Sequence, residues 1–87
     1  MFDTIIRGGT VLDGTGRPGF TADVGITAGK IAAVGALSAA PASRVIDASG
    51  RVVTPGFIDI HRHADAAAFR PGYGELELRQ GLTTIVN

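Results

Sequence analysis

The sequence contains no cysteine, has no net charge and has no long hydrophobic run. Without cysteine, these residues hold neither a disulfide framework nor a thiolate metal ligand. A formal charge of zero gives no electrostatic reason to expect nucleic acid or an anionic membrane as a partner. No apolar stretch approaches the ~20 residues of a membrane helix, and residues 1–9 lack the pattern of a signal peptide. We therefore expect a cytoplasmic protein with no nucleic-acid or membrane partner.

The first part of the chain, up to residue 54, is a series of short β-type runs with turn residues between them. Glycine occupies each break, and tight hairpin turns need the positive φ that glycine supplies. The runs predict three antiparallel hairpins across residues 8–9, 28–29 and 48–50, with a loop at Asp13–Gly19. The six predicted strands are Thr4–Arg7, Thr10–Leu12, Asp23–Thr27, Lys30–Val34, Arg44–Asp47 and Arg51–Val53. Such a pattern favours a small β-sandwich or half-barrel.

After Pro55 the pattern changes to strand, loop, helix and strand. The predicted elements are a strand at Phe57–Ile60, a loop over residues 64–74, a helix at Glu75–Gln80 with Gly81 as its cap, and a strand at Thr83–Val86. This order predicts a parallel strand pair with a right-handed crossover. It is typical of one unit of a (β/α)8 barrel. We therefore divide the chain into residues 1–54 and residues 55–87.

The two histidines of the chain, His61 and His63, follow the first of these strands. Residues two apart on a strand share a face, so both lie on the face of Phe57 and Asp59. Polar side chains on a buried face need partners. Two imidazoles can converge on one zinc ion where a strand curls at its end. A bare H-x-H pattern also occurs by chance, but the Pro-Gly break and the acid favour a metal site.

The stretch Thr54–Asp65, TPGFIDIHRHAD, resembles the signature that opens the barrel of the amidohydrolase superfamily. The end of the chain, Glu77–Asn87, is similar to the N-acyl-D-amino-acid deacylase (D-aminoacylase) branch. The resemblance implies a mixed β and α/β fold. In it, residues 1–54 form the N-terminal half of a β-sandwich subdomain and residues 55–87 the first strand-helix-strand unit of a (β/α)8 TIM barrel. It also implies that His61 and His63 bind zinc or another divalent metal.

The activity implied by this resemblance is metal-dependent hydrolysis of a linear amide such as an N-acyl-D-amino acid. A zinc-type ion lowers the pKa of a bound water to about 7 and polarises the amide carbonyl. The resemblance places the general base beyond residue 87, so no catalytic residue is assigned here. Asp59 is expected to orient a ligand or to cap the strand end, and Asp65 is assigned no catalytic role. Ala64 departs from the usual H-T-H-D-D pattern of the branch, without affecting the two ligands.

We thus expect an N-terminal part of a longer enzyme, inactive by itself, with a small-molecule amide as substrate. One alternative is a cyclic amidohydrolase of the hydantoinase or dihydropyrimidinase kind. Another is a non-catalytic β-rich interaction module that has lost the barrel. The apolar strands Phe57–Ile60 and Thr83–Val86 need a cover, so we expect self-association or the remainder of the enzyme to supply one.

Overall fold

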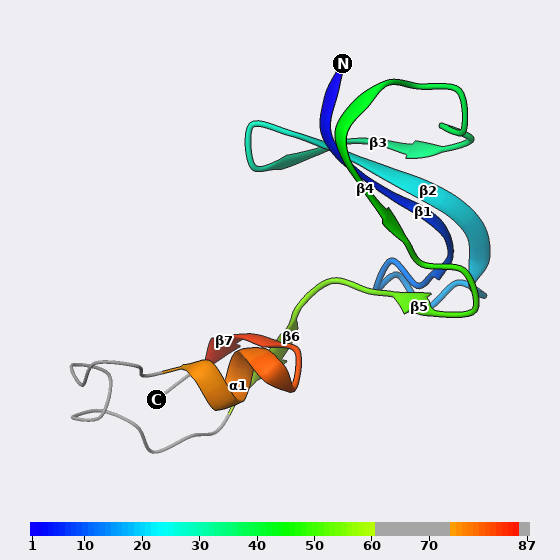
Figure 1. The fold of residues 1–87 in the computed structure, drawn as a ribbon. Helices are drawn as coiled ribbons and strands as arrows, with labels where there is room; N and C mark the ends of the chain where they lie inside the picture. The colour runs from blue at the N-terminus through cyan, green and yellow to red at the C-terminus, as the bar shows by residue number, and fades with distance from the viewer. Residues whose placement is uncertain (61–73, 86–87) are drawn as a thin grey trace. The chain divides into compact units, whose positions relative to one another are not determined.

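The structure is a computed structural model that describes residues 1–60 and 74–85, with the backbone only at residue 77. The chain divides into two compact units, Met1–Pro55 and Gly56–Asn87 (Figure 1). Among the described residues, no helix has the length and apolar character needed to span a membrane.

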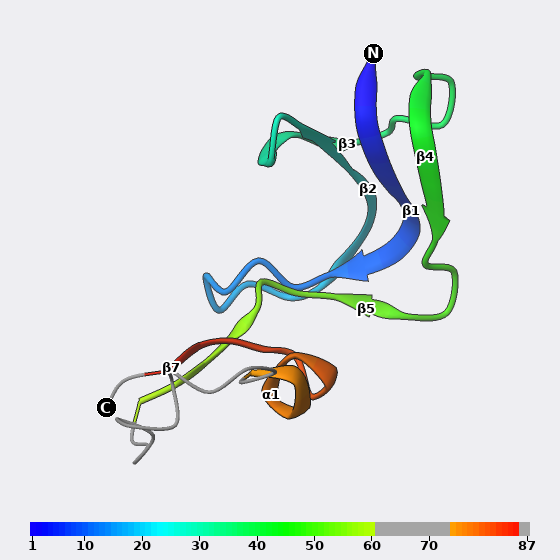
Figure 2. The same ribbon diagram turned by 60° about the vertical axis from the view of Figure 1, so that its left-hand side comes forward.

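The strands of the first unit are β1 (Phe2–Val11), β2 (Phe20–Thr27), β3 (Lys30–Gly35), β4 (Ala42–Asp47) and β5 (Val52–Val53). They form a five-stranded sheet in the order β3-β2-β1-β4, with β5 also paired to β1. Figure 2 shows β1 and β2 curving together, so that the sheet bends strongly along its length. Its most buried apolar side chains are Ile5, Val11, Val24 and Ala48.

The hairpin predicted across Gly8 and Gly9 is wrong, because β1 runs through both glycines as one strand of ten residues. Gly8 has a φ of 76°, and the pairing of β1 with β2 shifts register between Ile6 and Gly9. The positive φ thus forms a β-bulge rather than a turn. At Gly9 an added Cβ would lie 2.5 Å from Val53 Cγ2, so close packing requires this glycine.

The hairpin predicted between Arg44–Asp47 and Arg51–Val53 is also wrong. Both β4 and β5 pair with β1, and both run parallel to it. The turn between them is a short interruption along one edge of β1, where the Ala48 amide donates to Arg7 O at 2.7 Å. The same residue types occur in a turn that reverses the chain and in a turn that interrupts a strand, so the local pattern does not distinguish the two kinds of turn.

The hairpin predicted across Ala28 and Gly29 is confirmed, since β2 and β3 pair antiparallel on either side of it. Both turn residues have positive φ, 52° and 74°, as primed hairpin turns require. Residues 13–19 connect β1 to β2 without regular structure, as predicted.

The second unit contains β6 (Phe57–Asp59), α1 (Glu75–Arg79) and β7 (Leu82–Ile85). The predicted order of strand, helix and strand and the parallel pairing of β6 with β7 are confirmed. Gly81 follows the helix with a φ of 86°, as a C-terminal cap glycine does. Arg79 and Glu75 form the expected ion pair at 2.8 Å, but both side chains are exposed and the pair contributes little.

Asp23 links three parts of the first unit. Its buried carboxylate accepts hydrogen bonds from the Gly8 amide in the bulge, at 2.8 Å, and from the Leu37 amide after β3, at 2.9 Å. Arg7 donates to the carbonyl of the same Leu37 at 3.3 Å. The amides of Leu37 and Gly8, and then the charge of Arg7, hold the pKa of Asp23 below its usual value. Both peptide groups of Leu37 are thus fixed by charged side chains.

Asp23→Asn is expected to destabilise the protein at neutral pH and to flatten the dependence of its stability on pH. One amide oxygen cannot replace two carboxylate oxygens as acceptors. A lowered pKa gives stability that is complete above the unfolded-state pKa near 3.8 and is lost as pH falls through the lower folded value. Urea unfolding between about pH 7 and pH 3 measures this effect.

Asp47→Asn is the matched control, because the exposed Asp47 carboxylate also has a lowered pKa, but through hydrogen bonds to the hydroxyl and the amide of Ser49 within its own turn. We expect a smaller change for this variant. If Asp23→Asn kept the wild-type pH profile, the bridging role of Asp23 would be refuted.

Candidate metal centre

The predicted metal ligands His61 and His63 lie outside the described residues, as does Asp65, so their assignment stays a prediction. Strand β6 leads towards them and ends at Asp59, which is half-buried and paired with Ile85 of β7. Within residues 1–60 and 74–85, no three His, Cys, Asp or Glu side chains gather as metal ligands would. The backbone bends at residue 60, directly after β6.

A chain of backbone hydrogen bonds ties the start of β6 to the end of α1. The Leu78 amide donates to Gly74 O at 2.9 Å, and the Gly81 amide to Leu78 O at 3.0 Å. The Phe57 amide then donates to Gly81 O at 2.8 Å. A Cβ on Gly81 would lie 3.0 Å from the Phe57 ring, so the ring packs on the bare backbone. This fixes the entry of β6 beside the helix cap.

In the second unit, the sequence pattern did not predict which side chain packs against each glycine. The Pro55-Gly56 pair indicated a chain break, but the side chain that lies against Gly56, Thr83, is 27 residues away in the sequence. No local pattern identifies such a pair. Only the register of β6 and β7 brings the two residues together.

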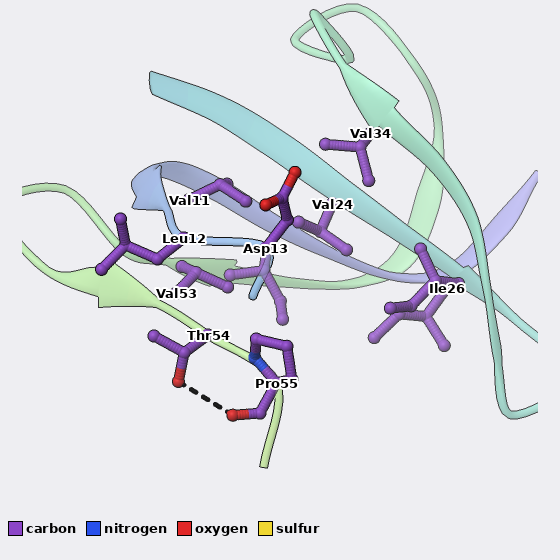
Figure 3. Close-up of a pocket in the computed structure, with 11 residues that line it drawn as sticks. Val11, Leu12, Asp13, Val24, Ile26, Val34, Val53, Thr54 and Pro55 are labelled. Carbon is purple, nitrogen blue, oxygen red and sulfur yellow. Dashed lines mark hydrogen bonds between the residues drawn. The ribbon is translucent and has the colours of Figure 1, made fainter. Parts of the chain in front are cut away.

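A concavity of about 220 Å³ lies in the first unit, on one face of the curved sheet (Figure 3). Its lining is almost wholly apolar and comes from β1, β2, β3 and the β5 end. The lining residues are Ile6, Val11, Leu12, Asp13, Val24, Ile26, Ile31, Val34, Val53, Thr54 and Pro55.

The one acid in this lining is already paired. Asp13 accepts hydrogen bonds from the hydroxyl of Thr15 and from Arg17, both at 2.5 Å. These bonds lower the pKa of Asp13 to about 2. A carboxylate held ionised in this way is a poor general base at neutral pH. The concavity is therefore suited to contact with an apolar surface, and it does not have the character of a reaction centre.

Residues 44–87 match the family model described as Amidohydrolase family, and both predicted ligands lie inside this match. The chain belongs to the amidohydrolase family. Two curated relatives of this family member come from Alcaligenes xylosoxydans xylosoxydans. An N-acyl-D-glutamate deacylase is 53% identical over 97% of this chain, and a D-aminoacylase is 46% identical over 98%. The predicted resemblance to the N-acyl-D-amino-acid deacylase branch is thus confirmed. The chain spans 17–18% of the length of these relatives.

Solved amidohydrolase structures agree with this assignment. The N-acyl-D-glutamate deacylase of Bordetella bronchiseptica, in complex with zinc and a phosphonate inhibitor, has a TM-score of 0.90 and 45% identity. The match covers 97% of this chain and 18% of that protein. An L-hydantoinase from Arthrobacter aurescens is less similar, with a TM-score of 0.73 and 32% identity over 98% of this chain and 20% of that one. The strand-rich first unit therefore corresponds to the β region of the deacylases.

Proposed function

We propose that the protein carrying this sequence is a metal-dependent amidohydrolase that hydrolyses N-acyl-D-amino acids. The 53% identity to an N-acyl-D-glutamate deacylase across 97% of this chain carries the proposal. Residues 1–54 belong to its β-sandwich subdomain, and residues 55–87 form the first unit of its (β/α)8 barrel. The parallel pair of β6 and β7 around α1 supports the barrel assignment.

The donor set that follows β6 fits a zinc ion. Two imidazoles are good zinc ligands, and they must converge to lie about 2.0–2.1 Å from the metal. Strand β6 ends at Asp59 and the backbone bends at residue 60, so regular extended geometry stops before the first histidine. His61 and His63 would hold the ion, and Asp59 would support their orientation. A bound zinc supplies an activated water and polarisation of the amide carbonyl.

The exposed apolar side chains of the second unit support a larger enzyme around it. Phe57 is 54% exposed and Ile58 61%, and Leu76 and Leu78 of α1 are also largely exposed. A barrel sheet buries both of its faces. The remainder of a barrel would cover these side chains. The substrate in this proposal is a small-molecule amide, and the location is cytoplasmic.

A substrate comparison tests the proposed function. The purified protein, as its source makes it, is incubated with N-acetyl-D-glutamate, N-acetyl-L-glutamate and hydantoin, before and after removal of metal and its return as zinc. We expect zinc-dependent release of acetate from the D-substrate, with much slower turnover of the other two. Preferred turnover of hydantoin would favour the cyclic amidohydrolase instead. No hydrolysis of any amide by the zinc-loaded protein would refute the proposal.

A further inference from the structure

We propose that Gly56 is a positioning residue for the metal pair, because its missing side chain leaves the space that Thr83 of β7 occupies. This contact sets the register with which β6 leads to His61 and His63. The inference rests on the proposed function, since it concerns the metal pair proposed there.

The pairing of β6 with β7 is irregular at this point. Phe57 is opposite Leu82, and Ile58 is opposite Thr84, so β7 contains one extra residue, Thr83. After this shift Asp59 is opposite Ile85. A slip of one residue in a strand turns every following side chain to the other face. The position of this irregularity therefore decides the neighbours of the strand end that precedes the ligands.

Space for the extra residue exists only because residue 56 is glycine. A Cβ added to Gly56 would lie 2.1 Å from Thr83 Oγ1, 2.3 Å from its Cγ2 and 2.7 Å from its Cβ. Rotation of the Thr83 side chain does not move its Cβ, and β-branched side chains have few χ1 alternatives. Gly56 has no positive φ, so the requirement is for room and not for a special backbone conformation. An alanine at position 56 must displace backbone.

Such a displacement would arise only a few residues before the ligands in the sequence. Strand β6 has only three residues, and Asp59, its last, is two positions before His61. Metal sites tolerate deviations of only about 0.5 Å in their ligands. Gly56→Ala is therefore expected to weaken zinc binding at least ~10-fold, comparable with the loss of a group that orients a ligand.

The test compares zinc affinity and the unfolding midpoint of the metal-free protein in four variants of the whole protein. Gly56→Ala should lose zinc affinity strongly, and Thr83→Gly should lose it mildly because the contact is gone without a clash. The double variant Gly56→Ala/Thr83→Gly should return to the value of Thr83→Gly, since all three clashing atoms are removed. Gly35→Ala is the control, because a Cβ there meets no atom within 4 Å and its φ is not positive; it should bind zinc as wild type does.

Each outcome decides between the possibilities. If the wild type itself binds no zinc, the proposed function and this inference both fail. If the wild type binds zinc and Gly56→Ala binds it equally well, only the inference fails. A lower unfolding midpoint of Gly56→Ala with unchanged zinc affinity would show a structural role alone and would overturn the inference. Should Gly56→Ala not fold, wild-type affinity in Thr83→Gly would overturn it too.

Discussion

Replacing His61 or His63 by asparagine is expected to remove most of the bound zinc and to lower amide hydrolysis by more than ~100-fold. Even residues that only orient a ligand change metal affinity or activity by 10–100-fold, so loss of a ligand should exceed that range. Asparagine keeps a polar side chain of moderate size but lacks the imidazole nitrogen that zinc prefers. Metal content of the purified protein and the rate with N-acetyl-D-glutamate measure the two effects.

Arg62→Gln is the matched control for these variants. Arg62 lies between the two histidines in the sequence, but its guanidinium stays protonated and has no lone pair to offer a metal ion. We expect its zinc content and hydrolysis rate to stay close to those of the wild type. Full zinc content in the His61 and His63 variants would contradict the ligand assignment. If Arg62→Gln lost as much zinc and activity as the two histidine variants, the effect would come from the whole segment and not from the imidazoles.

Ile5→Ala is expected to lower the free energy of unfolding by about 2–5 kcal/mol, the range for large-to-small substitutions in a packed core. Ile5 has 0% exposure and is the largest fully buried side chain among the described residues. It lies on the central strand β1, opposite Gly25 of β2 and Val45 of β4. Removal of its side chain would leave a cavity where three strands meet. Urea unfolding of the purified protein measures the change.

Ile5→Val is a milder substitution at the same position and is expected to lower the free energy of unfolding by about 0.5–1.5 kcal/mol. Val45→Ala removes an apolar group from the adjacent strand, where the side chain is 49% exposed, and should cost less than Ile5→Ala. If Ile5→Ala unfolded at the wild-type urea concentration, Ile5 would not be part of the core of the first unit.

The errors in the predicted topology come from glycines whose role is set by distant residues. Ala28 and Gly29 form the expected turn, because both flanking runs reach each other through local pairing. Gly8 and Gly9 are also turn-type residues between two β-type runs, yet β1 continues through them. The reason is that β4 and β5 pair along the other edge of β1, which the local pattern does not contain. The parallel pairing of β1 with the distant strands β4 and β5 is therefore the part of the first unit that sequence reasoning missed.

In the second unit, local chemistry was sufficient for most of the prediction. The cap at Gly81 and the ion pair of Glu75 with Arg79 involve residues within one helical turn or next to it, so the sequence displays them directly. The extra residue Thr83 in β7 is different, because it depends on the bare backbone of Gly56, directly before β6. The metal ligands were assigned from the H-x-H spacing together with the resemblance to the amidohydrolase signature.

The most direct test of the metal site is an anomalous difference map at the zinc edge, from crystals of the protein as its source makes it, grown with zinc. We expect a peak about 2.0–2.1 Å from one imidazole nitrogen of His61 and of His63, at the distance that zinc–nitrogen bonds require. A zinc peak bonded to other residues, or no peak near the two histidines, would contradict the account.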